Sequence, residues 1–196
     1  DIAALNKWIE EESKLGNPGL EARIERTGDE ELKKLLAWST VVNERVADMV
    51  YGVPPFPGVR ESLKKLNDQS EIIVVSQTPY EALKREWDEH QIATYASVIA
   101  GQEAGKKSEH LDMATAGRGY DPERMLMIGD APGDLKAAKA NDALFYPIVP
   151  GQEEQSWKRF HQEAVDRFLN GTYAGAYQQE LLHEFSRALP EQPPWK

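Results

Sequence analysis

The stretch Met125-Leu-Met-Ile-Gly-Asp130-Ala-Pro-Gly-Asp134-Leu-Lys-Ala-Ala decides the fold class of this chain, because an apolar run ends in two carboxylates four residues apart. Its first four residues are predicted to form a short strand buried on both faces, and Gly129 lets the backbone turn after it. Pro132 suits the first turn of the helix that follows. Ligands of open α/β sheets bind outside the carboxyl ends of the strands, and paired carboxylates are ligands that Mg²⁺ prefers. The stretch therefore predicts a metal site at a strand end.

The same spacing allows a simpler interpretation. Asp is a common cap and an ordinary first-turn residue, so Asp130 could only cap the helix while Asp134 faces water. The apolar strand that runs directly into Gly-Asp favours the metal site instead. Two further motifs, described below, strengthen that interpretation.

Composition limits the function classes that remain. The chain has 196 residues with 23 basic and 33 acidic side chains, and its formal net charge of −10 argues against general binding of nucleic acids or anionic membranes. The absence of cysteine excludes disulfides, thiolate zinc sites and cysteine nucleophiles. No apolar run approaches the roughly 20 residues that span a bilayer, and no signal-peptide pattern opens the chain, so a soluble cytoplasmic protein is expected. The sequence does not indicate the oligomeric state.

The chain changes character at a proline-rich segment, residues 52–58. Residues 1–55 are predicted to form an all-helical domain, with a break at 16–19 and a helix that starts at a capping-box pattern from Thr27 to Glu30. Residues 56–196 alternate between strands and helices, which predicts a mostly parallel sheet of the α/β class with a helical C-terminal tail. The expected strands are 72–75, 98–100, 125–128 and 144–149, and the expected helices are 59–66, 79–90, 108–116, 135–140 and, interrupted near 170–171, 153–189.

Two groups of side chains are expected to be structural. Trp8 and Trp38 fall in amphipathic helices, so we expect both to pack the helical domain against the rest of the chain. The histidines show no metal-ligand spacing and are expected at the surface. They are His90, His110, His161 and His183.

The second motif is Ile72-Ile-Val-Val-Ser76-Gln77-Thr78-Pro-Tyr-Glu81. A buried strand delivers Ser76 to its carboxyl end, and Thr78 and Glu81 have capping-box spacing for the next helix. A hydroxyl beside the free amides of a helix start suits a phosphoryl oxygen. The alternative is that Ser76 only satisfies the backbone of the turn.

The third motif is Gly101-Gln-Glu-Ala-Gly-Lys106-Lys107-Ser-Glu-His110, which lies between a short strand and a helix. A lysine at this place can direct its ammonium group at the same crevice. Lysine pairs are usually solvated surface, but the position between the serine strand and the Gly-Asp strand favours a functional role. The sequence does not decide whether Lys106 or Lys107 reaches the site.

The three motifs together resemble the second, third and fourth motifs of the haloacid dehalogenase-like (HAD) superfamily, over roughly residues 56–151. The resemblance implies a Rossmann-like parallel-sheet core with a helical cap formed by residues 1–55. It also implies a Mg²⁺-dependent phosphatase that hydrolyses a small phosphorylated metabolite through an aspartyl phosphate. In such a hydrolase the second motif and the lysine bind the phosphoryl group, and the fourth motif binds the metal. The positions that match are Ser76 and Gln77, then Lys107 or Lys106, then Asp130 and Asp134.

The first motif of that superfamily, an apolar strand ending in Asp-x-Asp, is not found, because no Asp-x-Asp pair occurs in the 196 residues. In the family this strand lies between the Ser76 strand and the Met125 strand, so its absence predicts a gap in the middle of the sheet. We expect the strand and its nucleophile to precede Asp1 in the complete protein. A non-catalytic relative that binds a phosphorylated ligand is the main alternative, and a phosphomutase, phosphonatase or dehalogenase is a further one.

Overall fold

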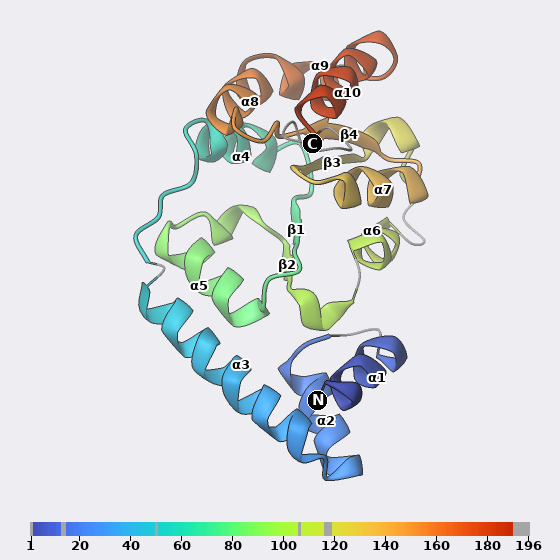
Figure 1. The fold of residues 1–196 in the computed structure, drawn as a ribbon. Coiled ribbons are helices and arrows are strands. Elements are labelled where there is room, and N and C mark those ends of the chain that lie inside the picture. The colour runs from blue at the N-terminus through green and yellow to red at the C-terminus, as the bar shows by residue number, and fades with distance from the viewer. Residues whose placement is uncertain (1, 13–14, 50, 106, 116–118, 190–196) are drawn as a thin grey trace. The chain divides into compact units, whose positions relative to one another are not determined.

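The structure is a computed structural model that describes residues 2–12, 15–49, 51–105, 107–115 and 119–189 (Figure 1). Helices alternate with short parallel strands after a helical N-terminal segment, which confirms the predicted α/β fold class. The chain divides into two compact units, which are described separately. The first unit holds residues 1–54, 73–94 and 98–106, and the second holds residues 55–72, 95–97 and 107–196. The expected boundary at residues 55 to 56 stays a prediction.

Three helices form the N-terminal part of the first unit, and they are α1 (Ala3–Glu11), α2 (Asn17–Thr27) and α3 (Glu30–Met49). The sequence did not predict α2, because its Gly16-to-Gly19 segment reads as a break. Pro18 instead lies in the first turn of the helix, where its missing N–H costs no hydrogen bond. A break and a helix start therefore share the same residues.

The predicted capping box at the start of α3 is wrong. Gly28 adopts a left-handed conformation with φ of 66° and ends α2, so α3 starts two residues later than a cap at Thr27 requires. The cap is Asp29, whose Oδ1 accepts the backbone N–H groups of Glu31 at 2.9 Å and Leu32 at 3.2 Å.

The three helices enclose a small apolar core. Trp8, Leu20 and Leu32 are buried there, so Trp8 packs among the three helices, and its expected packing against the rest of the chain stays a prediction. The expectation for Trp38 is wrong, because 64% of its surface is exposed. The next residue, Ser39, still donates to Asn17 of α2 at 2.7 Å, so α3 contacts α2 here through another side of the helix, and the amphipathic pattern did not show which side is covered.

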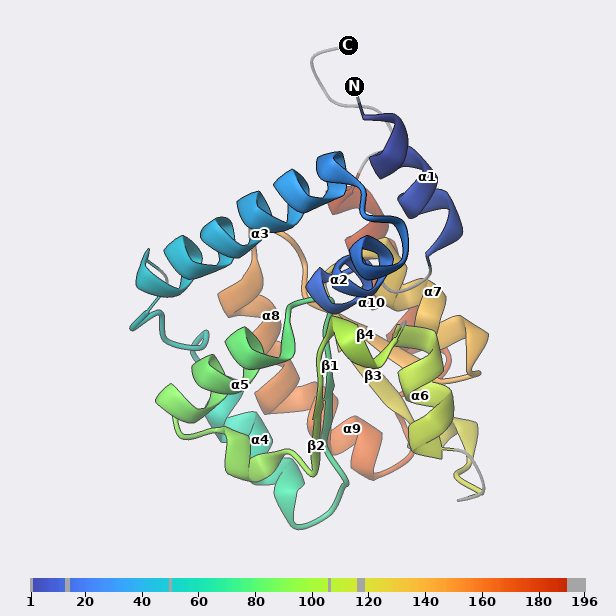
Figure 2. The same cartoon turned by 90° about the horizontal axis from the view of Figure 1, so that it is seen from below.

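The rest of the first unit contains a two-stranded parallel sheet and the helix that follows its first strand. β1 (Ile73–Val75) pairs with β2 (Val98–Ala100), and Val74 lies opposite Ile99 (Figure 2). α5 (Tyr80–Glu89) follows β1, and the short 3-10 helix η2 (Gln102–Ala104) follows β2. A further 3-10 turn, η1 (Ala93–Tyr95), lies at the junction with the second unit.

The second unit contains the other parallel pair. β3 (Leu126–Gly129) pairs with β4 (Leu144–Pro147), and the intervening helix α7 (Pro132–Ala140) packs on both strands. All four residues of β4 are buried. The remaining elements of this unit are α4 (Val59–Asn67), α6 (Lys107–Thr115), η3 (Pro122–Arg124), α8 (Glu153–Arg159), the π-helical turn η4 (Phe160–Ala164), α9 (Val165–Leu169) and α10 (Ala176–Ala188).

The main core of the second unit lies where β4 meets the tail helices. Tyr146 stacks at 4.8 Å between ring centroids on Phe160, and its hydroxyl donates to the Ser156 carbonyl at 2.6 Å. Tyr173 donates to the Phe145 carbonyl at 2.8 Å. The tail thus covers one side of the β3–β4 pair, and the predicted interruption near residues 170–171 is found between α9 and α10.

The strands of the described chain form two separate sheets, β1 with β2 and β3 with β4. The two pairs belong to different units, and the predicted gap between the strand before Ser76 and the strand before Asp130 stays a prediction. Among the helices that the structure describes, none is both long and apolar enough to cross a membrane.

Candidate functional site

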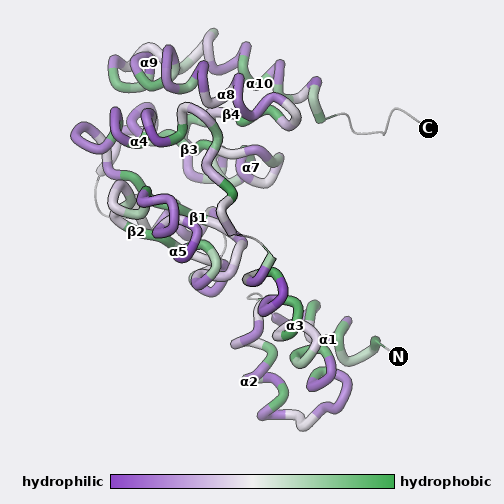
Figure 3. The backbone as a smooth tube through the Cα atoms, turned by 90° about the vertical axis from the view of Figure 1, so that its left-hand side faces the viewer, coloured by the Kyte–Doolittle hydropathy of each residue, from purple (hydrophilic) through white to green (hydrophobic). Residues whose placement is uncertain are grey.

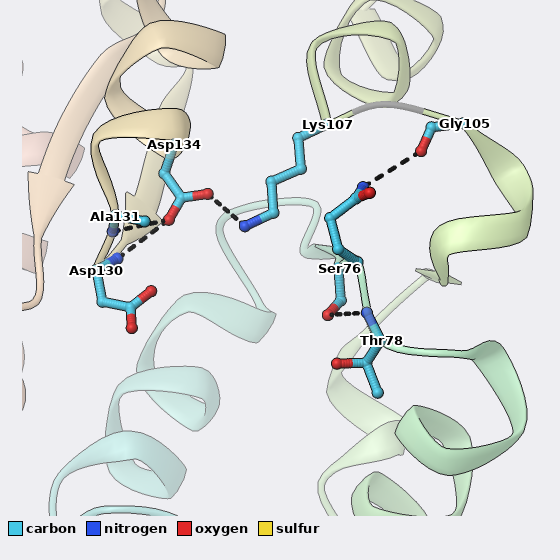
Figure 4. Close-up of polar contacts among 8 residues, drawn as sticks. Ser76, Thr78, Gly105, Lys107, Asp130, Ala131 and Asp134 are labelled. Atoms are coloured by element: carbon cyan, nitrogen blue, oxygen red, sulfur yellow. Dashed lines mark hydrogen bonds and ion pairs between the residues drawn. The ribbon is translucent and has the colours of Figure 1, made fainter. Parts of the chain in front are cut away.

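Asp134 is a buried carboxylate at the start of α7, with 2% of its surface exposed. Its Oδ2 accepts the backbone N–H groups of Asp130 at 3.2 Å and Ala131 at 3.1 Å, and its Oδ1 pairs with the Lys107 ammonium (Figure 4). The carboxylate therefore closes the turn between β3 and α7 and ties α6 to it. The simpler interpretation, in which Asp134 faces water, is wrong.

Asp130 lies at the carboxyl end of β3 and is exposed. Its backbone N–H is bound to Asp134, which fixes the main chain while the side chain projects away from that hydrogen bond (Figure 4). The simpler interpretation assigned the cap to Asp130, but the structure assigns it to Asp134. The two carboxylates thus have different surroundings, one enclosed and one open to a ligand.

Gly129 makes this turn possible through its lack of a side chain. A Cβ built at this position would lie 2.5 Å from both Cβ and Cγ of Asp134, closer than real Cβ contacts come. The Gly-Asp-x-x-x-Asp sequence is therefore a single packing unit, in which the glycine leaves room for the second carboxylate to reach back to the backbone.

Lys107 begins α6, and 28% of its side chain remains exposed while it is paired with Asp134. The side chain is therefore partly accessible from solvent. Lys106, the other predicted candidate, lies outside the described residues. Within the second unit, the structure brings Lys107 together with the Asp130 and Asp134 segment, from two different stretches of the sequence.

Ser76 and Gln77 belong to the first unit and follow β1 directly. The Ser76 Oγ accepts the Thr78 backbone N–H at 3.1 Å, which leaves the hydroxyl proton available to donate (Figure 4). The Gln77 amide donates to the Gly105 carbonyl at 3.4 Å. Ser76 therefore both stabilises the turn and keeps a donor, whereas Gln77 links the two loops that follow β1 and β2.

The helix start after Ser76 is already occupied by a carboxylate of the chain itself. Glu103, in η2, accepts the Tyr80 backbone N–H through both oxygens, at 3.1 and 3.3 Å. Gly101 permits this approach, because a Cβ there would lie 2.5 Å from the Tyr80 nitrogen. The expected free amides at this helix start are therefore not all free, and Glu103 is a residue that sequence reasoning missed.

His110 is also different from its prediction. It lies three residues after Lys107 in α6, only 4% of its surface is exposed, and neither ring nitrogen has a hydrogen-bond partner among the described residues. Unpaired buried nitrogens are uncommon in folded proteins. The helical spacing from Lys107 could have indicated that His110 shares the buried side of α6.

The metal expected here is Mg²⁺, and the donor set fits it in part. Asp130 offers an exposed carboxylate, whereas both oxygens of Asp134 are already bound to N–H groups or to Lys107. In the ranges that the structure describes, no cluster of three or more acidic or histidine side chains could hold a metal. Asp130 is therefore suited to bind the metal directly and Asp134 to hold the loop that presents it.

A comparison with protein families matches residues 4–146, well over half of the chain, to the model described as haloacid dehalogenase-like hydrolase. This match includes the helical segment, the loops after β1 and β2, and the carboxylates that follow β3. No significant match was found among curated proteins or among solved structures.

Proposed function

Because the chain belongs to the haloacid dehalogenase-like hydrolase family, we propose that the protein is a Mg²⁺-dependent phosphatase of small phosphorylated metabolites. The observation that carries the proposal is the Lys107 to Asp134 ion pair beside the exposed Asp130 carboxylate. Lys107 supplies a fixed positive charge for a phosphoryl dianion, and Asp130 supplies a carboxylate for a divalent metal. Phosphoryl transfer requires both kinds of charge.

Each residue then has a separate task. Asp134 holds Lys107 and the turn in place, and Lys107, whose side chain stays partly accessible, neutralises the phosphoryl oxygens. Asp130 would hold the Mg²⁺ ion, which supplies further positive charge at the phosphoryl group. Ser76, whose hydroxyl proton is free to donate, binds a phosphoryl oxygen. The proposal also includes an aspartate nucleophile, which these 196 residues do not offer as an Asp-x-Asp pair.

The test is phosphate release by the full-length product of the reading frame, with and without Mg²⁺. We expect Asp130→Asn to lower the Mg²⁺-dependent rate by at least about 100-fold, because a lost metal ligand removes several kcal/mol of charge stabilisation. Asp142→Asn is a matched control. Asp142 is also an exposed aspartate, but it precedes β4 at the opposite edge of the same strand pair.

Equal rates for Asp130→Asn and the wild type would refute the metal assignment. A second candidate, a module that binds a phosphorylated ligand without chemistry, is favoured by the lack of an Asp-x-Asp pair. Phosphate binding without any turnover in the full-length protein would support that candidate instead. Product analysis would separate a hydrolase from a mutase, a phosphonatase or a dehalogenase.

A further inference from the structure

The loop after β2 holds the loop that carries Ser76. Ser76 itself continues the pairing of β1 with β2, because its backbone N–H donates to the Ala100 carbonyl at 3.0 Å. Two residues later, the Thr78 carbonyl accepts the Gln102 N–H at 3.1 Å. In Figure 3 the two strands are hydrophobic and α5 is largely hydrophilic, so the chain passes from an apolar strand to a polar loop at Ser76. Backbone contacts to the second loop therefore hold this polar loop as far as Thr78.

The start of α5 has no cap of its own. The N-cap residue is Pro79, which has no side-chain oxygen, and no side chain makes a cap hydrogen bond from that position. The helix begins one residue later than the capping-box spacing from Thr78 to Glu81 requires, so the expected box is not formed. The first N–H groups of any helix lack intrahelical partners and need acceptors from elsewhere.

Glu103 supplies this acceptor from η2. Both of its carboxylate oxygens accept the Tyr80 N–H, at 3.1 and 3.3 Å, and a negative charge is favourable at a helix N-terminus. A Cβ at Gly101 would lie 2.7 Å from the Glu103 Oε2, so the glycine leaves room for the carboxylate as well as for the Tyr80 backbone. The carboxylate therefore ties α5 to the loop after β2 two residues beyond the Thr78 contact.

The position of Thr78 decides what the Ser76 hydroxyl can do. The Ser76 Oγ accepts the Thr78 N–H at 3.1 Å (Figure 4), and a hydroxyl held in this way keeps its proton for another acceptor. If the first turn of α5 frays, the Thr78 N–H moves away from the Oγ and the hydroxyl is free to turn. Displacement of a positioned group by about 1 Å can cost on the order of 100-fold in rate.

We propose that Glu103 is a positioning residue for Ser76, and that it holds the Ser76 hydroxyl, through the first turn of α5, in the orientation that binds a phosphoryl oxygen. This inference rests on the proposed function, because it takes Ser76 as a phosphoryl-binding residue. Glu103 acts through Tyr80 and Thr78 and not on the phosphoryl group itself. Its negative charge alone would repel a phosphate, so loss of the contact and loss of the charge have opposite effects on phosphate binding.

Titration of the full-length protein with inorganic phosphate shows which effect is larger. Glu103→Ala should raise the Kd by at least about tenfold, because the misdirected Ser76 hydroxyl loses a hydrogen bond to a charged group. Glu103→Gln should recover most of this loss, since its amide oxygen can still accept the Tyr80 N–H. Tighter binding by Glu103→Ala, or a Glu103→Gln variant as weak as Glu103→Ala, would overturn the proposal.

Glu81→Ala is the matched control. It removes the same charge from the first turn of α5, but the described residues include no partner of the Glu81 side chain. Its Kd for phosphate should therefore stay near that of the wild type, and a loss equal to that of Glu103→Ala would overturn the proposal.

A double-mutant cycle with Ser76→Ala, on variants that circular dichroism shows to be folded, tests whether Glu103 acts through Ser76. In the Ser76→Ala background, Glu103→Ala should have little further effect on the Kd, whereas additive effects would overturn the proposal. Phosphate release by the same variants separates this inference from the proposed function. In a protein that binds phosphate without turnover, the cycle still decides the role of Glu103. A protein that binds no phosphate would overturn both proposals.

Discussion

Replacement of Asp134 by Asn tests whether this carboxylate holds the site together. The side chain is 2% exposed and accepts three donors, the Lys107 ammonium and the backbone N–H groups of Asp130 and Ala131. An Asn has one acceptor oxygen, so if that oxygen stays on the two N–H groups, its NH₂ group faces the lysine. The substitution therefore removes the ion pair and replaces two charge-assisted hydrogen bonds with neutral ones.

The magnitude follows from these contacts. Hydrogen bonds to a charged group contribute about 1 kcal/mol more than neutral ones, and there are two of them here. Breaking a buried ion pair costs about 3 to 5 kcal/mol, but Lys107 is 28% exposed and can be rehydrated, so the lower end applies. Together these contributions predict that Asp134→Asn lowers the free energy of unfolding by about 5 kcal/mol.

The assay is urea denaturation at neutral pH, followed by circular dichroism and by tryptophan fluorescence. Asp130→Asn makes the same chemical change four residues earlier at an exposed position and should stay within about 0.5 kcal/mol of the wild type. Lys107→Met in both backgrounds completes a double-mutant cycle, with an expected coupling of about 1 to 3 kcal/mol. If Asp134→Asn is as mild as Asp130→Asn, or if the coupling is zero, the reasoning is refuted.

Two further predictions concern the same unit. Gly129→Ala should lower the free energy of unfolding by about 1 to 3 kcal/mol through overpacking against Asp134. It should also abolish the coupling between Asp134 and Lys107. A loss of stability below about 0.5 kcal/mol would show that the turn adjusts to the added methyl group. Burial raises the pKa of Tyr177 above the ordinary value of a phenol to about 12, and raises the pKa values of Tyr146 and Tyr173 further. Because the folded state favours the neutral phenols, their contribution is complete below pH 10 and is lost as the pH rises through about 12. In a variant with Tyr51, Tyr80, Tyr95 and Tyr120 replaced by Phe, only the three buried tyrosines remain. Unfolding and tyrosinate absorbance of that variant should rise together in an alkaline titration, and tyrosinate formation near pH 10 without unfolding would contradict the burial.

The local elements were predictable where a short pattern decides them. The apolar runs before Ser76 and Asp130 predict strands, and both are found within a residue of their predicted limits. The helix that ends at Met49 was predicted, but its first residue was not. Gly28 adopts a left-handed conformation, and the residue that caps the helix is Asp29 rather than Thr27. Capping motifs compete over two or three residues, and the sequence does not rank them.

The roles of the two carboxylates could not be predicted from their spacing. The sequence places Asp130 and Asp134 at a strand end, but both have the same chemistry there. Their difference arises because Gly129 leaves room for Asp134 alone to fold back onto the backbone. The exposure of apolar side chains on α3 could not be predicted either, because an amphipathic pattern shows an apolar face but not whether another helix covers it.

The sequence by itself therefore determined the α/β alternation, the helical N-terminal segment and the places of Ser76, of the Lys106 and Lys107 pair and of the two carboxylates, because hydrophobic periodicity and turn residues act over a few neighbours. Only the tertiary structure decided which groups are paired, buried or free. In the folded chain, Lys107 pairs with Asp134, which is 27 positions away in the sequence. Glu103 accepts a backbone N–H at the start of α5, and His110 is buried. Burial and ion pairing depend on contacts between distant segments, which no local pattern encodes.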